Sequence, residues 1–554
     1  MATDTKAADS GHTQDLRRHV GLVGLLFASV GSIIGSGWLF GALNASQQAG
    51  PAAIISWAIG GVMILLIALV YAELGTMFPL SGGVVRYPHL SFGSFASYTT
   101  GWITWVAVAT TAPIEVEAAL QYATKYYPFT IEKTLADGST VQTLTGVGYG
   151  VAAALLAVFV VVNYYGIRWF ARINNALVWW KLGIITLVII AFLFTAFHGA
   201  NFTSFGFKPE GWHGVFTAIS TSGIVFSYLG FRQGIELAGE TTNPRRNVPI
   251  AVIGSVLLTG VIYVALQIAF IGALNPSILT KSDGWAHLSF ANDFGPLAAL
   301  ATLLGLGWLA VLLYADAIIS PGDTGLIYTT ITSRISYAMA RNQNAPRALA
   351  NTTSRGVPLV SLIVTFLVGL IVFLPFPSWQ QLVGFITSAT VMSFASGPLV
   401  LASLRRQVPD HERPFRLPGG HIIPVLAFWC SNLIVYWSGW DIVWKLMLSV
   451  LLGFVLLAIF HVTGASRQPL DFKAGASWLL PWLGSTALIS WLGDYGGGIG
   501  VIGFGWSILI LLGVSVAVYA IAVANRLAPE EAQRHIEYSR KESEVEEETM
   551  GATP

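Results

Sequence analysis

Two basic side chains stand inside long apolar stretches of the sequence. Lys181 lies within 174–197 and Arg232 within 213–238. A lysine or arginine at the centre of a membrane-crossing helix costs at least ~2.5 kcal/mol on insertion scales, so each is expected to have a partner and a function. A lysine can exchange a proton, and the planar guanidinium of an arginine binds a carboxylate in a bidentate manner. The two residues therefore suggest proton transfer and recognition of an anionic group.

Small residues interrupt two of the apolar stretches. The segment Gly31–Gly37 holds three glycines, and 222–230 reads Ser-Gly-Ile-Val-Phe-Ser-Tyr-Leu-Gly. A glycine in a helix interior costs up to ~1 kcal/mol relative to alanine. Either the small residues let neighbouring helices approach closely, or the helices unwind there, which a membrane tolerates only where the backbone lines a cavity.

Unwound backbone of this kind suits a zwitterionic substrate. The N-terminus of a half-helix offers free N–H groups and attracts anions, so a substrate carboxylate is expected on the N–H groups of Gly35, Ser36 and Gly37. An ammonium group is expected on the freed carbonyl groups. Because the interrupted stretches are the first and the sixth, they also indicate an inverted repeat of spans 1–5 and 6–10.

The elements that must position these residues are membrane helices, so the predicted fold class is all-α integral membrane. The chain is 54% hydrophobic and 10% charged, whereas soluble domains carry about 25% charged residues. Stretches of about 20 apolar residues predict fourteen spans: 20–43, 52–78, 95–124, 146–165, 174–197, 213–238, 248–273, 297–337, 356–375, 379–403, 421–438, 442–463, 476–493 and 500–525. The eighth is too long for one crossing and is expected to include an extra helix.

The lysines and arginines give the predicted orientation. With the N-terminus in the cytoplasm, Lys181 and Arg232 lie within spans, and all the other basic residues fall inside except Lys125, Lys133, Lys208, Lys281 and Lys445, as the positive-inside rule requires. We expect a multi-pass protein of the inner (plasma) membrane with both termini cytoplasmic. The predicted parts are an N-terminal tail (1–18), an inverted-repeat transport core (19–404), four further helices (405–527) and a charged, solvated C-terminal tail without an apolar face (528–554).

Four motifs in order resemble the amino acid–polyamine–organocation transporters, and in particular bacterial aspartate or amino acid:proton symporters. The motifs are Gly31–Phe40 in the first span, Tyr71–Gly75 with Pro79–Gly83 around the second, Asn243–Pro249 after the sixth and Ser333–Arg341 at the end of the eighth. The resemblance covers roughly residues 18–465, so it says nothing of the last two spans. The sequence Ser320-Pro-Gly-Asp323-Thr-Gly325, which interrupts the eighth span, departs from the family pattern.

The resemblance implies a leucine-transporter-type fold of ten core helices in two inverted repeats, alternating access, and an amino acid or amine substrate. Tyr228 or Phe226 is implied as an aromatic gate. The implied substrate contacts are Ser36 and Gly37 for the carboxylate and the carbonyls of Ile33, Phe226 and Leu229 for the ammonium.

Lys181 is predicted to carry the coupling proton. Sodium-coupled relatives of this fold place an ion between the first and eighth spans, and an ammonium group from the fifth span reaches the same place. Burial disfavours the charged form of a lysine, which lets it release a proton during the cycle. Asp323 and Ser320 lie at the matching level of the eighth span and are the expected partners. The alternative is a lysine that snorkels to the cytoplasm.

Arg232 is predicted to read an acidic side chain, because it follows the second interruption directly. The corresponding position of the family faces the distal end of the substrate, and relatives that carry a basic substrate have a carboxylate there. The sign is reversed here, which indicates aspartate, glutamate or a close analogue. The alternative is an intrahelical pair with Glu236, four residues on, which leaves a neutral amino acid as the default substrate.

These features predict a proton-coupled importer of acidic amino acids; a neutral amino acid importer or an amino acid/amine exchanger is the alternative. Glu115 and Glu117 differ by two residues, so they face different sides of their helix, with solvent access in its outer half and no role in binding the substrate carboxylate. The motifs indicate no enzyme, cofactor or nucleic-acid partner, and the single Cys430 excludes a cysteine-type metal site. The expected partners are the amino acid, the proton and the lipid bilayer, with the protein a monomer or homodimer.

Overall fold

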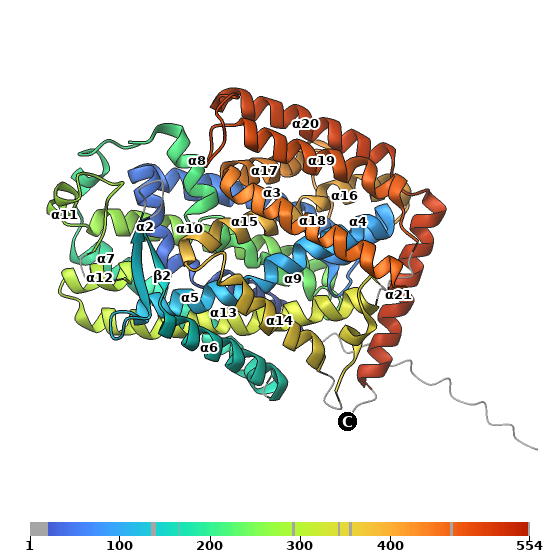
Figure 1. Ribbon diagram of the computed structural model, residues 1–554, viewed down its shortest axis with the longest axis horizontal. Coiled ribbons are helices and arrows are strands. Elements are labelled where there is room, and N and C mark those ends of the chain that lie inside the picture. Colours follow the sequence, from blue (N-terminus) through green and yellow to red (C-terminus); the bar gives the residue numbers. More distant parts are fainter. Residues whose placement is uncertain are drawn as a thin grey trace, which may run out of the picture.

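The computed structural model describes residues 20–134, 140–165, 167–290, 294–341, 344–353, 357–465 and 469–551, and it is a bundle of helices (Figure 1). The predicted N-terminal tail lies outside these residues. The elements, with 3-10 helices labelled η, are α1 (Leu22–Ile33), α2 (Gly37–Ala49), η1 (Gly50–Ala52), α3 (Ala53–Met77), α4 (Gly83–Ala109), α5 (Thr111–Ala123), β1 (Thr130–Thr134), β2 (Thr140–Leu144), α6 (Gly146–Tyr165), α7 (Ile167–Thr195), η2 (Gly199–Phe202), α8 (Gly211–Thr221), η3 (Phe226–Arg232), α9 (Gln233–Glu236), α10 (Pro244–Ala273), α11 (Pro276–Lys281), α12 (Pro296–Leu303), α13 (Gly307–Arg341), η4 (Arg347–Ala350), α14 (Leu359–Val372), α15 (Trp379–Phe394), α16 (Ser396–Gln407), α17 (Ile422–Trp437), α18 (Trp440–Val462), α19 (Phe472–Leu492), α20 (Phe504–Ala524) and α21 (Pro529–Gly551).

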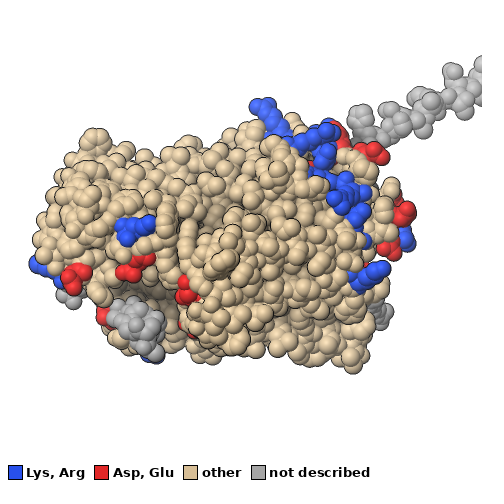
Figure 2. Space-filling model, turned by 90° about the horizontal axis from the view of Figure 1, so that it is seen from above, with Lys and Arg blue, Asp and Glu red and all other residues tan. Residues whose placement is uncertain are grey.

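The bundle has the length and composition of a multi-pass membrane protein. Among the described residues, nine helices are long and apolar enough to cross a membrane, or ten if α8 and the bent η3–α9 segment form one span. Each predicted apolar range contains at least one helix, and the long eighth range holds both α12 and α13, as expected. Figure 2 shows a broad surface without charge, with lysine, arginine, aspartate and glutamate gathered toward the two ends of the molecule. Such a surface fits a hydrocarbon solvent.

The first and sixth apolar ranges are both broken, which confirms the predicted unwinding. Three residues, 34–36, separate α1 from α2. In the sixth range α8 ends at Thr221, and η3 continues after a short gap at an angle of 44° to α8. Gly223, in that gap, has a φ of +89°, a backbone conformation that side chains with a Cβ rarely adopt.

The two breaks touch each other through backbone. A Cβ on Gly230 of η3 would overlap the main chain of Ser32 and Ile33 at the end of α1. A Cβ on Gly37, at the start of α2, would overlap the side chain of Ser227. Glycine is therefore required by close approach as well as by unwinding, so both interpretations of the small residues apply.

The eighth range differs from the expectation at Ser320–Gly325. The predicted interruption is wrong, because α13 continues through Pro321 as one helix from Gly307 to Arg341. Proline removes one N–H donor without necessarily ending a helix that neighbours hold in place. Gly325 lies against the ring of Phe159 in α6, where a Cβ would come within 2.5 Å of Phe159 Cε2.

The C-terminal segment is docked rather than solvated, which corrects the prediction of a free tail. Helix α21 packs against α4 and α16 and crosses one end of the bundle (Figure 1). The chain leading into it is held by Leu527, whose N–H donates to Ser91 O over 3.0 Å and whose carbonyl accepts from Gln407 Nε2 over 2.8 Å. The ring of His535 lies edge-on to that of His89 at 4.4 Å, and this burial lowers the pKa of His535. A few buried contacts along one side of α21 therefore suffice to hold this polar helix against the bundle.

We predict that Gly230→Ala destabilises the fold, because its new methyl group overlaps the α1 main chain. Overpacking of this kind costs about 1–3 kcal/mol. Gly183→Ala is the matched control, since Gly183 lies inside α7 and a Cβ added there would have no atom within 4 Å, so the change should be neutral or slightly stabilising. Thermal unfolding of both variants in detergent measures the difference. Equal stability of the two variants would contradict the tight contact between the breaks.

Candidate substrate and proton site

The break between α1 and α2 binds a carboxylate of the protein itself. The Ser36 N–H, at the start of α2, donates to Glu115 Oε2 of α5 over 2.8 Å. The Ser36 hydroxyl accepts a hydrogen bond from Trp379 Nε1 of α15, also over 2.8 Å. A substrate carboxylate is expected at the N–H groups of residues 35–37, and in this structure Glu115 binds the N–H of the middle residue, Ser36. The half-helix N-terminus thus attracts an anion, as its dipole favours.

Lys181 lies on the other side of the same break. Its Nζ donates to the carbonyl of Gly31, near the end of α1, over 2.8 Å and to Thr324 Oγ1 of α13 over 3.2 Å. It also forms an ion pair with Asp323 Oδ2 at 2.5 Å, and neither side chain is exposed. Lys181 stands at the middle of the 29-residue α7. The alternative of a lysine that snorkels to the cytoplasm is therefore wrong, and the expected partnership with Asp323 is present.

Thr324, which accepts from Lys181, and Glu115 both lie beside Gly35. A Cβ on Gly35 would lie 2.7 Å from Glu115 Oε1 and 3.0 Å from Thr324 Oγ1, so both side chains border the unwound segment. Within the described part of the chain, no group of three or more histidine, cysteine, aspartate or glutamate side chains is placed to hold a metal ion. The arrangement instead brings one ammonium and two carboxyl groups to the break, a set suited to moving a proton.

A second carboxyl group of α13 was not predicted from the sequence. Asp316 is fully buried, and its Oδ1 accepts hydrogen bonds from Trp180 Nε1 over 2.8 Å and from the expected partner Ser320 over 2.6 Å. Ser320 therefore contacts Asp316 rather than Lys181. The signal was available, because Asp316 precedes Asp323 by seven residues, which is about two helical turns and places both on one face.

The break of the sixth range carries Arg232 at the end of η3. Its side chain is fully buried, and Nη2 pairs with Glu236 Oε1 at 2.9 Å, the intrahelical alternative considered above. The guanidinium carbon lies 5.8 Å from the ring centre of Phe394. Nε and Nη1 have no hydrogen-bond partner among the described residues. A buried guanidinium with spare donors is costly, so this cation is poised for a further acceptor.

The aromatic residues of η3 point in different directions. Tyr228 donates from its hydroxyl to Trp57 O over 3.2 Å and packs between the rings of Trp57 and Tyr263, on the side of α3 and α10. Phe226 instead lies edge-on to Trp379, with ring centres 6.3 Å apart. Of the two aromatic gates implied by the resemblance, Phe226 is the one that borders Trp379 and the α2 break.

The carbonyl groups expected to bind an ammonium are only partly free. The carbonyl of Ile33 accepts from Gly35 N over 3.1 Å and from Tyr263 Oη over 3.4 Å. Phe226 and Leu229 are buried within η3, with exposed fractions of 9% and 3%. Substrate contacts at these carbonyls remain a prediction.

Glu115 and Glu117 of α5 are both buried, but they have different surroundings. Glu115 faces the α1–α2 break, whereas Glu117 is buried with both oxygens lacking a hydrogen-bond partner among the described residues. The prediction that they face different sides is confirmed. The predicted solvent access is wrong, because their exposed fractions are 1% and 2%.

The sequence of this protein, with its two broken helices in contact, matches a known family. Residues 20–460 match the amino acid permease family. The chain belongs to that family. The permease is 41% identical to the glutamate/serine transporter AimA of Bacillus subtilis over 92% of this chain and 94% of the relative. It is 36% identical to the aspartate-proton symporter of the same organism, over 91% and 96% of the two chains.

A more distant relative is also named as an amino acid permease. The branched-chain amino acid permease BcaP of Bacillus subtilis is 25% identical over 82% of this chain and 96% of the relative. The family and these relatives are transporters rather than enzymes, so the permease is a membrane transport protein. The resemblance stated from the four motifs is thereby confirmed.

We predict that Lys181→Met lowers the free energy of unfolding by about 3–5 kcal/mol, because Asp323 then keeps a buried charge without its partner. The double variant Lys181→Met/Asp323→Asn removes that lone charge and should regain most of the loss. Unfolding of the purified permease in SDS measures both. A double variant as unstable as the single one would show that packing, and not charge pairing, governs this position.

Proposed function

We propose that this permease is a proton-coupled importer of acidic amino acids, aspartate or glutamate, working as a monomer or homodimer in the bilayer. The observation that carries the proposal is Arg232, a fully buried guanidinium beside the sixth-range break with two donor atoms unpaired among the described residues. A side-chain carboxylate of the substrate satisfies these donors in a bidentate or forked geometry. The relatives named for glutamate and for aspartate support this chemistry.

Binding of the substrate backbone follows from the α1–α2 break. In the proposal the α-carboxylate takes the N–H groups of Ser36 and Gly37, with Gly35 leaving room for it, and the ammonium takes carbonyls of Ile33, Phe226 and Leu229. Glu115 accepts from Ser36 N in the substrate-free structure, so the substrate must displace it. Protonated Glu115 is a weaker acceptor than the carboxylate, and this links proton binding to substrate binding.

Lys181 completes the proposed coupling. Its ammonium bridges Gly31 of α1 and Asp323 of α13, where it fills the role that sodium plays in sodium-coupled relatives of the fold. Transfer of its proton to the cytoplasm leaves a neutral amine, which no longer attracts Asp323 and loosens α1 from α13. The proposal therefore requires no sodium.

We infer fourteen crossings, twelve plus two, with the first ten in a 5+5 inverted repeat that works by alternating access. The predicted ranges and the paired breaks in the first and sixth support this count. Lysine and arginine gather at the end of the molecule where α21 lies (Figure 2), which supports cytoplasmic termini under the positive-inside rule. The inner (plasma) membrane is the proposed location.

A neutral amino acid substrate is the second candidate, and the ion pair between Arg232 and Glu236 favours it. In that case the pair is structural and no substrate carboxylate replaces Glu236. The relative whose name includes serine supports this alternative.

Lys181→Ala should abolish uptake driven by a pH gradient, because the site loses its exchangeable proton. Uptake of radiolabelled aspartate into proteoliposomes, with and without an imposed pH gradient, measures the effect. Lys473→Ala, at an exposed position of α19, is the matched control and should transport normally. Full and still pH-dependent uptake by Lys181→Ala would refute the coupling role.

Arg232→Ala should raise the KM for aspartate by ~10-fold or more, because a charge-assisted hydrogen bond is lost. Arg232→Lys should keep part of the affinity, since it restores the charge without the planar fork. Arg245→Ala is the control, because Arg245 pairs with Glu412 at an exposed site where its side chain is 61% exposed. If excess aspartate and glutamate fail to inhibit uptake of the true substrate, the acidic assignment is wrong and a neutral amino acid takes its place.

A further inference from the structure

Trp379, the first residue of α15, connects both broken helices. Its indole N–H donates to Ser36 Oγ at the start of α2 over 2.8 Å. Its ring lies 4.8 Å from that of Phe40 in α2 and 6.3 Å from that of Phe226 in η3. The side chain is fully buried. The proposed binding of substrate and proton does not involve Trp379.

Gly223 makes room for this indole at the sixth-range break. A Cβ there would lie 2.8 Å from Trp379 Cη2, and the φ of +89° independently requires glycine. A serine of the same break, Ser222, donates to the carbonyl of Asn44 in α2 over 3.2 Å. The indole thus closes the space between α2 and the end of α8.

The strands β1 and β2 pair antiparallel as a hairpin, and the indole lies on the side of this hairpin. Trp379 lies two residues after Pro377, whose carbonyl accepts from Leu144 N of β2 over 3.1 Å. In the proposed orientation the hairpin is extracellular. Trp379 therefore stands between the outer surface and the unwound segments.

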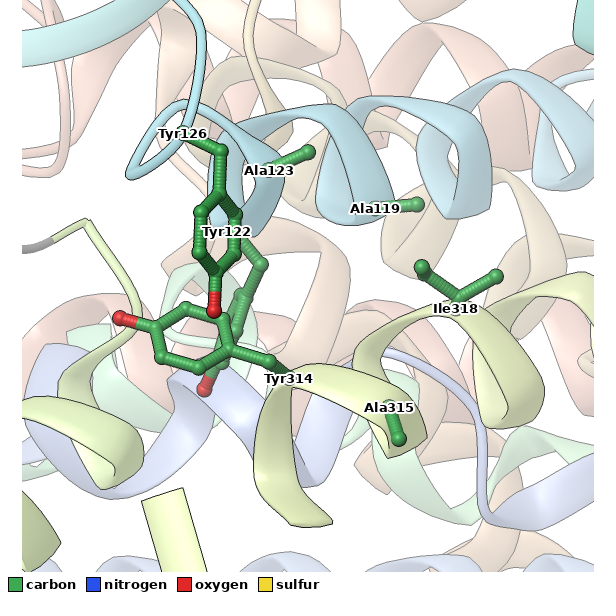
Figure 3. A pocket seen from close by; sticks show the side chains of 7 residues that line it. All are labelled: Ala119, Tyr122, Ala123, Tyr126, Tyr314, Ala315 and Ile318. Carbon is green, nitrogen blue, oxygen red and sulfur yellow. The ribbon is translucent and has the colours of Figure 1, made fainter. Parts of the chain in front are cut away.

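Aromatic rings continue from Trp379 toward that surface. Phe40 contacts Tyr122 of α5 at 5.3 Å, and Tyr314 of α13 lies 6.0 Å from Tyr122 and 5.4 Å from Tyr126. The three tyrosines line a cavity between α5 and α13 (Figure 3). Its volume is about 190 Å³. Its other lining residues are Ala119, Ala123, Ala315 and Ile318. This cavity has no charged lining residue that could bind an amino acid, so we do not interpret it as a second substrate site. It lies where the series of aromatic contacts that begins at Trp379 reaches the outer side of the protein.

We propose that Trp379 is the outer gate of the permease, a positioning residue that closes the site by holding α2 and the sixth-range break together. Opening toward the extracellular side requires the bond from Trp379 Nε1 to Ser36 Oγ to break and the indole to leave Gly223. This inference rests on the proposed function for its direction. It adds a residue that neither the motifs nor the charged groups indicated.

Cysteine labelling from outside the cell tests the gate. The reporter is Ser227→Cys, an isosteric change one turn beyond Gly223, in a Cys430→Ala background that removes the chain's only cysteine. Trp379→Phe keeps an aromatic ring but loses the indole N–H. It should raise the labelling rate by a membrane-impermeant thiol reagent about fivefold, the change that one ordinary hydrogen bond makes to an equilibrium. Trp379→Ala and Gly223→Ala should raise the rate further.

Trp482→Phe is the matched control. Trp482 is also buried, and its indole donates over 2.8 Å to the side-chain oxygen of Asn432, at a place away from the breaks. The control should leave the labelling rate unchanged. Labelling from the cytoplasmic side, in inverted vesicles, should not rise in Trp379→Phe. Unchanged outside labelling in all three gate variants, or an equal rise from both sides, overturns the proposal. Since labelling needs neither substrate nor pH gradient, it succeeds or fails independently of the acidic substrate and the proton coupling.

Discussion

The unwound backbone between α1 and α2 must find hydrogen-bond partners inside the membrane, where no water replaces them. Three helices supply these partners, and a fourth binds the side chain of Ser36. Lys181 of α7 donates to the carbonyl of Gly31, and Glu115 of α5 accepts from the N–H of Ser36. The hydroxyl of Tyr263 in α10 donates to the carbonyl of Ile33, and the indole of Trp379 in α15 donates to the hydroxyl of Ser36. The rotation of each helix about its axis is thereby tied to one short segment, and any movement of that segment is transmitted to all four.

The motif residues of α3 support the second break indirectly. Tyr71 donates from its hydroxyl to the carbonyl of Phe394 over 3.2 Å, and the ring of Phe394 lies under the Arg232 guanidinium. Glu73 pairs with Arg405 of α16 at 2.5 Å and accepts from Leu417 N over 2.7 Å. The Tyr71–Gly75 motif thus holds the junction of α15 and α16 in place. Phe394, at the end of α15, provides the ring that the Arg232 guanidinium covers.

Local signals in the sequence predicted the broken helices and indicated that Lys181 has a partner inside the bundle, because glycine clusters and a lone cation in an apolar run have direct energetic meanings. The position of Glu115 was not predictable, since it depends on how α5 is rotated against α1. Pro321 indicated a break that neighbouring helices suppress. The docking of α21 was missed because it needs only a few small contacts, such as buried Ala532 and Ser539, seven residues apart on one face. Tertiary packing determined the position of Glu115, the continuity of α13 at Pro321 and the docking of α21.

The pairing of charges at the two breaks has an electrical consequence. Lys181 with Asp323, and Arg232 with Glu236, each sum to zero formal charge. While both partners of a pair are charged, a displacement of that pair therefore does no net work against the membrane voltage, which acts with about 2.3 kcal/mol per elementary charge per 100 mV. When Lys181 gives up its proton in the proposed cycle, the pair with Asp323 keeps one negative charge, and the voltage then acts on that charge. The membrane voltage thus acts on the pair of Lys181 and Asp323 only when the lysine is deprotonated, whereas the pair of Arg232 and Glu236 keeps a net charge of zero.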